Sequence, residues 1–346
     1  MTSNRPLSFL DLTPIENGSN ATEALTTSVE LAQLAESLGY LRVWYAEHHN
    51  TAGLASAAPE IMIAHIANHT ERIRLGSGGV MLPNHAPLKI IETFKLLEAL
   101  NPGRVDLGLG RAPGTDTITA FAMRRSAEAL RADDYPERVV ELMAFDDGSF
   151  PPNHTFSTVR AVPFDVRMPP LFLLGSSEFS GLLAAQEGLG FGFAAHIGRA
   201  MAIPAMRAYR ERFQPSERYP EPYGILTVSV TIGDDEEHVS QLTRINELFL
   251  LRLRTGQLGR YPTLEEALAY QFTEHERAMI ASMPLNFVAG TAEQVYREVT
   301  DLADMCAADE VMITTTLPSR ADRERTLVAM AEQFGTVRRP VVAGGA

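Results

Sequence analysis

The sequence predicts an α/β protein of the (β/α)8 TIM-barrel class, a single domain over residues 1–346 with insertions after the fourth and seventh strands. Eight short apolar segments alternate with amphipathic helical segments, which is the pattern of a parallel sheet covered by helices. The first four strands start at residues 7, 41, 73 and 104, so each strand–helix unit has a similar length. No dinucleotide-binding fingerprint or domain break is evident early in the chain, and this favours the closed barrel over an open doubly wound sheet.

Four strand–helix units make up the predicted N-terminal half of the barrel. A capping box at Asn20–Glu23 begins the first helix, and Gly39 ends it as glycine commonly ends helices. The helix of the third unit has Pro87 near its start and ends at the turn Asn101–Gly103. The strands of this half are predicted at Leu7–Leu12, Leu41–Ala46, Ile73–Ser77 and Arg104–Leu109.

The second half keeps this order but contains two long interruptions. Helical sequence covers about 116–145, and a loop at Asp146–Pro170 precedes the fifth strand. Residues 234–305 form a mostly helical excursion with a loop near Thr255–Thr263 and a short apolar piece at Asn286–Ala289. The strands of this half are predicted at Leu171–Leu174, Gly190–Ala194, Gly224–Ile232 and Glu310–Thr314.

Composition excludes several classes of protein. The 30 basic and 43 acidic residues give a net charge of −13, which disfavours nucleic acid and an anionic membrane as partners. Because Cys306 is the only cysteine, we expect neither an intrachain disulfide nor a cysteine-based metal site. Neither a signal segment nor an apolar stretch of about 20 residues is evident, so the expected location is the cytoplasm.

The chemistry of a TIM barrel lies on the loops that follow its strands, and the first candidate is Glu47-His48-His49 after the second strand. Histidine titrates near neutral pH, so His48 could act as a general acid or base. A hydrogen-bonded structural histidine is the alternative. No metal site is expected, because adjacent ligands on a strand point apart and no companion cluster is evident.

Three further loops carry candidate ligand-binding groups. Glycines within Leu75–Val80 allow a flat ligand to approach the backbone, although a tight turn would explain them equally well. Arg111 lies in a glycine-rich loop and suits a phosphate, with a structural salt bridge as the alternative. Ser176 and Ser177 precede a helix predicted over 178–187, where free amides and hydroxyls form an anion site or simply cap the helix.

In order along the chain, these segments resemble the bacterial luciferase-like family of flavin-dependent monooxygenases. The likeness extends over about residues 7–335 and is specific for the family but not for a substrate. The matching segments are Val43–His49, Leu75–Pro83, Asn101–Arg111 and Phe287–Thr291.

The resemblance implies that FMN binds at the C-terminal ends of the barrel strands. Ser77, Gly78 and Gly79 match the segment beneath the isoalloxazine ring, where the family often has a non-proline cis peptide. Arg111 and Ser176 match the family's phosphate-binding positions.

The activity implied by the resemblance is that of an FMN-dependent, O2-using monooxygenase of the two-component kind, acting on an unidentified small organic substrate. His48 matches the family's active-site histidine. A separate flavin reductase would supply reduced FMN, consistent with the lack of a nicotinamide fingerprint. Gly110 and Gly175 stand where the light-emitting enzyme has a cysteine and a glutamate, which argues against light emission. The alternatives are a deazaflavin-dependent hydride-transfer oxidoreductase and a non-catalytic flavin-binding protein.

Two further expectations concern a lid and a dimer. The polar stretch Arg254–Tyr261, which contains two glycines, predicts a mobile lid over the site. The resemblance implies a homodimer formed by the helices after the second and third strands, whose apolar residues exceed what one buried stripe needs. These residues are Ile61, Ile63, Ile66, Ile90, Ile91 and Phe94.

Overall fold

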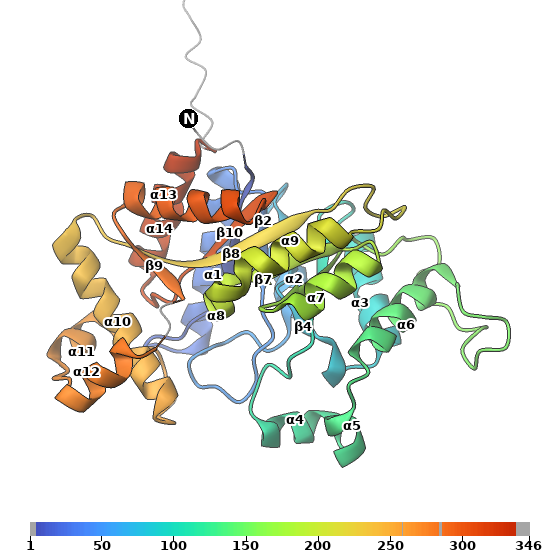
Figure 1. Ribbon diagram of the computed structural model, residues 1–346, viewed down its shortest axis with the longest axis horizontal. Coiled ribbons are helices and arrows are strands. Elements are labelled where there is room, and N and C mark those ends of the chain that lie inside the picture. Colours follow the sequence, from blue (N-terminus) through green and yellow to red (C-terminus); the bar gives the residue numbers. More distant parts are fainter. Residues whose placement is uncertain (1–4, 258, 284–285, 337–346) are drawn as a thin grey trace, which may run out of the picture.

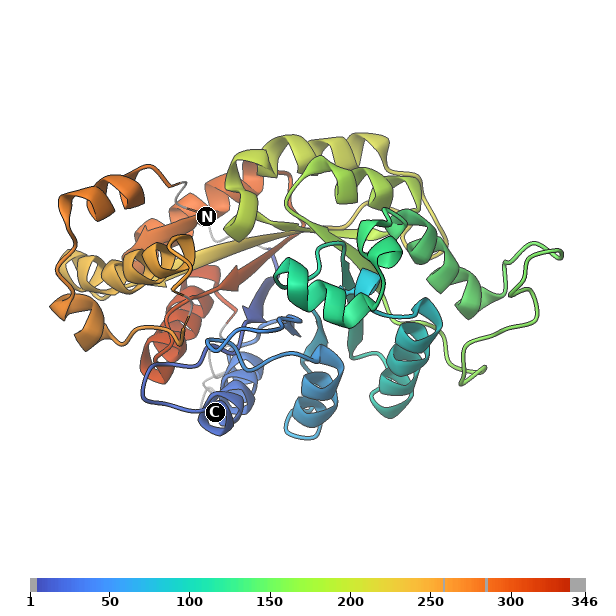
Figure 2. The same cartoon turned by 90° about the horizontal axis from the view of Figure 1, so that it is seen from below.

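A closed parallel barrel forms the centre of the molecule in the computed structural model, which describes residues 5–257, 259–283 and 286–336 (Figures 1 and 2). The last strand of the ring pairs with both the first and the seventh, which closes it and confirms the predicted barrel. In order around the ring the strands are β1 (Leu7–Asp11), β2 (Arg42–Tyr45), β3 (Arg74–Ser77), β5 (Val105–Gly110), β6 (Leu171–Gly175), β7 (Gly190–Ala194), β8 (Gly224–Ile232) and β10 (Glu310–Thr314).

Two short strands extend this ring. Strand β4 (Val80–Met81) continues the line of β3 and pairs with β5, so the chain returns to the sheet just after the glycine segment. Strand β9 (Phe287–Gly290) pairs with β8 in parallel, outside the closed ring. The apolar piece predicted at Asn286–Ala289 is therefore a strand.

Helices cover the outside of the barrel. The Asn20 side chain accepts a hydrogen bond from the amide of Glu23, as expected at the start of the first helix. The covering helices are α1 (Ala21–Ser37), α2 (Pro59–Ala67), α3 (Pro87–Leu100), α6 (Tyr135–Asp147), α7 (Glu178–Gln186), α9 (Ala202–Arg212), α13 (Ala292–Met305) and α14 (Arg320–Phe334).

Both predicted insertions are present. The first places α4 (Thr117–Arg124) and α5 (Ala127–Arg131) below the barrel in the view of Figure 1, before α6. The second contains α10 (Glu236–Arg254), α11 (Leu264–Ala269) and α12 (Glu274–Ala281), which lie to one side of the barrel in both views. Short helical turns occur at η1 (Leu82–Asn84), α8 (Ala195–Gly198) and η2 (Arg199–Met201).

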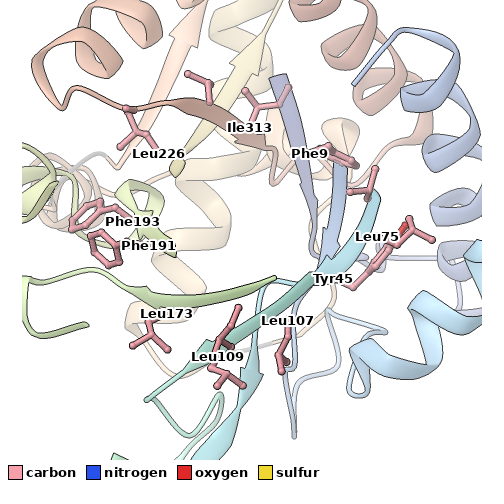
Figure 3. Packing of buried hydrophobic residues seen from close by; sticks show 14 of the residues in the cluster. Phe9, Tyr45, Leu75, Leu107, Leu109, Leu173, Phe191, Phe193, Leu226 and Ile313 are labelled. Carbon is pink, nitrogen blue, oxygen red and sulfur yellow. The ribbon is translucent and has the colours of Figure 1, made fainter. Parts of the chain in front are cut away.

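Alternation along the strands divides the apolar core into two parts. Phe9, Tyr45 and Ile313 belong to the main cluster between strands and helices, part of which is drawn in Figure 3. Their neighbours belong to a separate cluster inside the barrel, because successive side chains of a strand point to opposite faces. Members of this inner cluster are Leu10, Trp44, Ala46, Phe172, Ile225 and Met312.

Charged side chains fill the barrel interior near the N-terminal ends of the strands. The Arg42 guanidinium donates to Glu310 at 2.9 and 3.0 Å and to Asp106 at 2.7 Å. Trp44 Nε1 also donates to Asp106, and the Tyr223 hydroxyl donates to Glu310 at 2.7 Å. Each buried charge therefore has a partner, as the low polarizability of the interior requires.

Candidate active site

A cavity opens at the C-terminal ends of the strands, where TIM barrels carry their chemistry. Leu10, Trp44 and Met312, from the inner cluster, form part of its lining. The rest comes mainly from the segments that follow β3, β5, β6 and β7, and includes Gly78, Gly79, Arg111, Ser176 and His196. The structure thus gathers five groups from four separate loops into one cavity.

The glycine segment after β3 presents bare backbone to this cavity. The Gly78–Gly79 peptide is cis, as the resemblance implies. A Cβ atom at Gly79 would lie 2.8 Å from the carbonyl oxygen of Gly108, and one at Gly78 would lie 2.7 Å from Leu10 Cδ1. Larger residues would therefore displace the neighbouring strand or the inner cluster.

Ser77 has a role within the sheet. Its hydroxyl donates to the carbonyl oxygen of Gly108 and accepts from the Gly108 amide, both at 2.9 Å. The side chain is fully buried and is not among the described residues that line the cavity. Ser77 joins β3 to β5 beneath the cavity, and its predicted part in flavin binding stays a prediction.

Arg111 and Ser176 lie at the same end of the cavity. The Arg111 guanidinium stacks over the ring of Phe179, 4.2 Å from its centroid, and its ion pair with Asp133 is loose at 4.0 Å. Ser177 is the N-cap of α7, yet its side chain makes no capping hydrogen bond. Because Phe179 is in the first turn of α7, the half-exposed Arg111 guanidinium lies beside the N-terminus of that helix, which is an arrangement that binds anions.

Glu47 holds the loop after β2 in place. Its buried carboxylate accepts hydrogen bonds from Nε2 of His49 at 2.8 Å, from Nε2 of His85 at 3.0 Å and from the Met81 amide at 2.8 Å. Burial raises the pKa of Glu47, but the hydrogen bonds from His85 and His49 outweigh it and the net pKa is lowered. Glu47 therefore orients His49 and His85, and no hydrogen bond joins it to His48 in the part of the chain that the structure describes.

His48 is a half-buried residue that follows β2. It is not among the described residues that line the cavity, and its Nδ1 atom is buried without a hydrogen-bond partner there. Burial and the charge of His49 lower the pKa of His48, while the charge of Glu47 opposes them. A neutral imidazole with a free ring nitrogen is the form that accepts a proton.

His196 is a site residue that sequence reasoning missed. It follows β7, lines the cavity and, like His48, has a buried Nδ1 atom without a partner among the described residues. Burial lowers the pKa of His196 to about 4; hydrogen bonding to the Thr227 backbone opposes this, and the charge of His48 adds to it. The one available signal was its place directly after a predicted strand.

The segment predicted as a lid is fixed at one end. Tyr261 is 3% exposed, stacks on Phe249 at 4.1 Å, and exchanges backbone hydrogen bonds with Ile15 and Asn17. The structure describes residues 254–257 and 259–261 of this segment, and none of them lines the cavity. The structure gives the lid prediction no support.

The structure also lacks the excess of exposed apolar residues from which a dimer interface was predicted. Ile63, Ile66, Ile90, Ile91 and Phe94 are all buried in the chain's own core, so that argument was wrong. On the same two helices the exposed large apolar side chains are Ile61, Leu96 and Leu100.

A closed (β/α)8 barrel with a mostly apolar cavity at this end, lined also by glycines and a few polar groups, has the architecture of a TIM-barrel enzyme. The chain belongs to the luciferase-like monooxygenase family, whose model matches residues 6–309. It is accordingly an oxidoreductase of the monooxygenase class.

Individual relatives agree with this assignment. A luciferase-like monooxygenase of Escherichia coli K12 is 40% identical over 306 residues, covering 88% of this chain and 90% of that protein. The N-acetyl-S-alkylcysteine monooxygenase of Bacillus subtilis is 33% identical and covers 96% of this chain and 99% of its own. The crystal structure of apo-MsnO8 has a TM-score of 0.88 at 33% identity, covering 97% and 99% of the two chains. No helix in the described ranges is both long and apolar enough to cross a bilayer.

Proposed function

We propose that the chain is an FMN-dependent, O2-using monooxygenase of the two-component kind, acting on a small organic substrate. One observation carries the proposal. The same cavity is lined by Gly78 and Gly79, which have no side chains, and by Arg111 and Ser176 near the N-terminus of α7. A flat ring needs close approach to backbone, and a phosphate needs a cation with free amides and hydroxyls. FMN has both parts, joined by a short chain.

The residues present fit this cofactor. Gly78 and Gly79 leave the cavity wall without side chains where the ring would lie, and Arg111 with Ser176 would hold the phosphate. Reduced FMN supplies the electrons for O2 activation, and a separate reductase would deliver it. The neutral, desolvated histidines beside the cavity accept and return protons.

Two alternatives can be separated from this proposal by experiment. Among distant structures of this fold, one is a complex with FMN at 15% identity and another holds an F420–acetone adduct at 14%, so the barrel alone does not choose between flavin and deazaflavin. Reconstitution with each cofactor separates these two. O2 consumption in the presence of reduced FMN separates both enzymes from a non-catalytic flavin-binding protein.

Replacing Arg111 with glutamine should weaken FMN binding about 10- to 100-fold, because a hydrogen bond to a charged group contributes about 1.5–3 kcal/mol. Riboflavin, which lacks the phosphate, should bind both proteins equally. Fluorescence titration under anaerobic conditions measures both affinities, and the exposed Arg254→Gln variant is the matched control. Equal losses for FMN and riboflavin would show that Arg111 does not bind the phosphate.

The dimer is also proposed, with a smaller interface than the sequence suggested. Ile61 on α2 and Leu96 and Leu100 on α3 are 66%, 54% and 66% exposed, and they would lie at its centre. We expect light scattering to give twice the chain mass at micromolar concentration and the single-chain mass for Leu96→Lys. A monomeric wild-type protein would remove the proposal.

A further inference from the structure

Four histidines and one carboxylate lie between the cavity and the barrel rim, and we call them the histidine series: His196, His48, His49, Glu47 and His85. His196 lies in the cavity wall, and it is near enough to His48 that a charge on the His48 ring lowers the pKa of His196. His48 in turn interacts with His49. Glu47 then joins Nε2 of His49 to Nε2 of His85 through hydrogen bonds of 2.8 and 3.0 Å. The side chain of His85 is 27% exposed, so the series reaches solvent.

The inner half of this series has unused hydrogen-bonding atoms. The buried Nδ1 atoms of His196 and His48 are both without partners in the described part of the chain. Buried polar atoms are nearly always bonded, and exceptions call for a ligand, a water molecule or a chemical role. Because His196 lines the cavity, its ring can reach a molecule bound there, and this gives the residue a chemical role to fill.

We propose that His196 is a second catalytic residue, which takes a proton from the molecule bound in the cavity and passes it through His48 to the His49–Glu47–His85 group at the rim. In the first transfer, an O–H or N–H bond of the bound molecule breaks and an N–H bond forms on His196. The imidazolium then loses that proton to His48, which restores neutral His196. No oxidant or reductant takes part in these transfers.

The charges around the series favour this outward direction. Burial lowers the pKa of His196 to about 4, and burial and His49 lower that of His48. At the rim, burial lowers the pKa of His85, but the hydrogen bond and charge of Glu47 and the charge of Glu60 outweigh it, so the net pKa is raised. Proton affinity therefore increases from the cavity toward solvent. Arg111, the cation in the cavity lining, disfavours an imidazolium there as well.

NMR titration of the histidine side chains tests the series without any cofactor. In the full chain, His196 should titrate near pH 4, and in the His48→Gln variant its pKa should rise because the repulsion is removed. The exposed His275→Gln variant should leave the pKa of His196 unchanged. A His196 pKa that is ordinary, or that is the same in wild type and His48→Gln, would overturn the proposal.

The catalytic role of His196 rests on the proposed function, and it is tested by a separate measurement. After mixing enzyme-bound reduced FMN with O2, the return of oxidised-flavin absorbance should be about 10²-fold slower or more in His196→Gln, with FMN affinity unchanged. Added imidazole should restore part of the rate in His196→Ala, whereas it should not in Arg111→Gln. Unchanged rates in both histidine variants would overturn the role of His196 and leave the proposed function standing. Failure of the wild type to bind FMN would contradict the proposed function instead, and the NMR result would be unaffected.

Discussion

Replacing His48 with alanine is expected to lower turnover by about 10²–10⁴-fold, which is the usual contribution of a general acid or base. Its Nδ1 atom is buried without a partner in the described structure, and its pKa is coupled to the charges of His49 and His196. Removing it interrupts proton exchange with the cavity. Affinity for FMN should change little, because the groups proposed to bind FMN lie on other loops.

The control for this prediction is His275→Ala, which alters an exposed histidine on α12. Rapid-mixing spectra of the reduced enzyme with O2, and turnover with a substrate found by screening alongside a flavin reductase, provide the measurements. If His48→Ala forms product at the wild-type rate, His48 has no part in the mechanism.

Replacing Arg42 with methionine should lower the free energy of unfolding by about 3–5 kcal/mol, which is the usual effect of removing one partner from a buried ion pair. Among the described residues, the fully buried Glu310 carboxylate would then keep one hydrogen bond, from the Tyr223 hydroxyl. Asp106 would still accept hydrogen bonds from Trp44 Nε1 and Arg74 Nε. The unpaired carboxylate of Glu310 is therefore the main source of the loss.

Urea denaturation measures this loss, and the double variant Arg42→Met, Glu310→Leu provides the control. Because a buried pair is often replaceable by apolar residues of similar size, the double variant should be more stable than Arg42→Met alone. A double variant in which the two losses simply add would contradict the claim that the two side chains stabilise each other.

Strand positions were predictable because each barrel strand is a short apolar run between turn residues, and both faces of a parallel barrel are buried. The stretch 116–145 was harder, since its composition is helical throughout. The structure divides it where Arg125 adopts a left-handed conformation with φ of 65° and where Pro136 enters the first turn of α6. The break at Arg125 has no strong signal in the sequence, whereas Pro136 is an ordinary signal for a helix start.

The candidate site was predictable as far as single loops are concerned. Gly78, Gly79, Arg111 and Ser176 line one cavity, as their positions after successive strands suggested. The pairing of Glu47 with His85 was not predictable, because it depends on how two loops 38 residues apart pack together. His196 belongs to no motif, and a lone histidine after a strand is as often structural as functional.

The central claim is that this cavity binds FMN, and anaerobic titration of the chain with reduced FMN, reduced riboflavin and a reduced deazaflavin tests it most directly. We predict one FMN bound per chain, more tightly than either competitor, with the preference over riboflavin lost in Arg111→Gln. Equal affinity for FMN and riboflavin in the wild-type protein, or preference for the deazaflavin, would contradict the account.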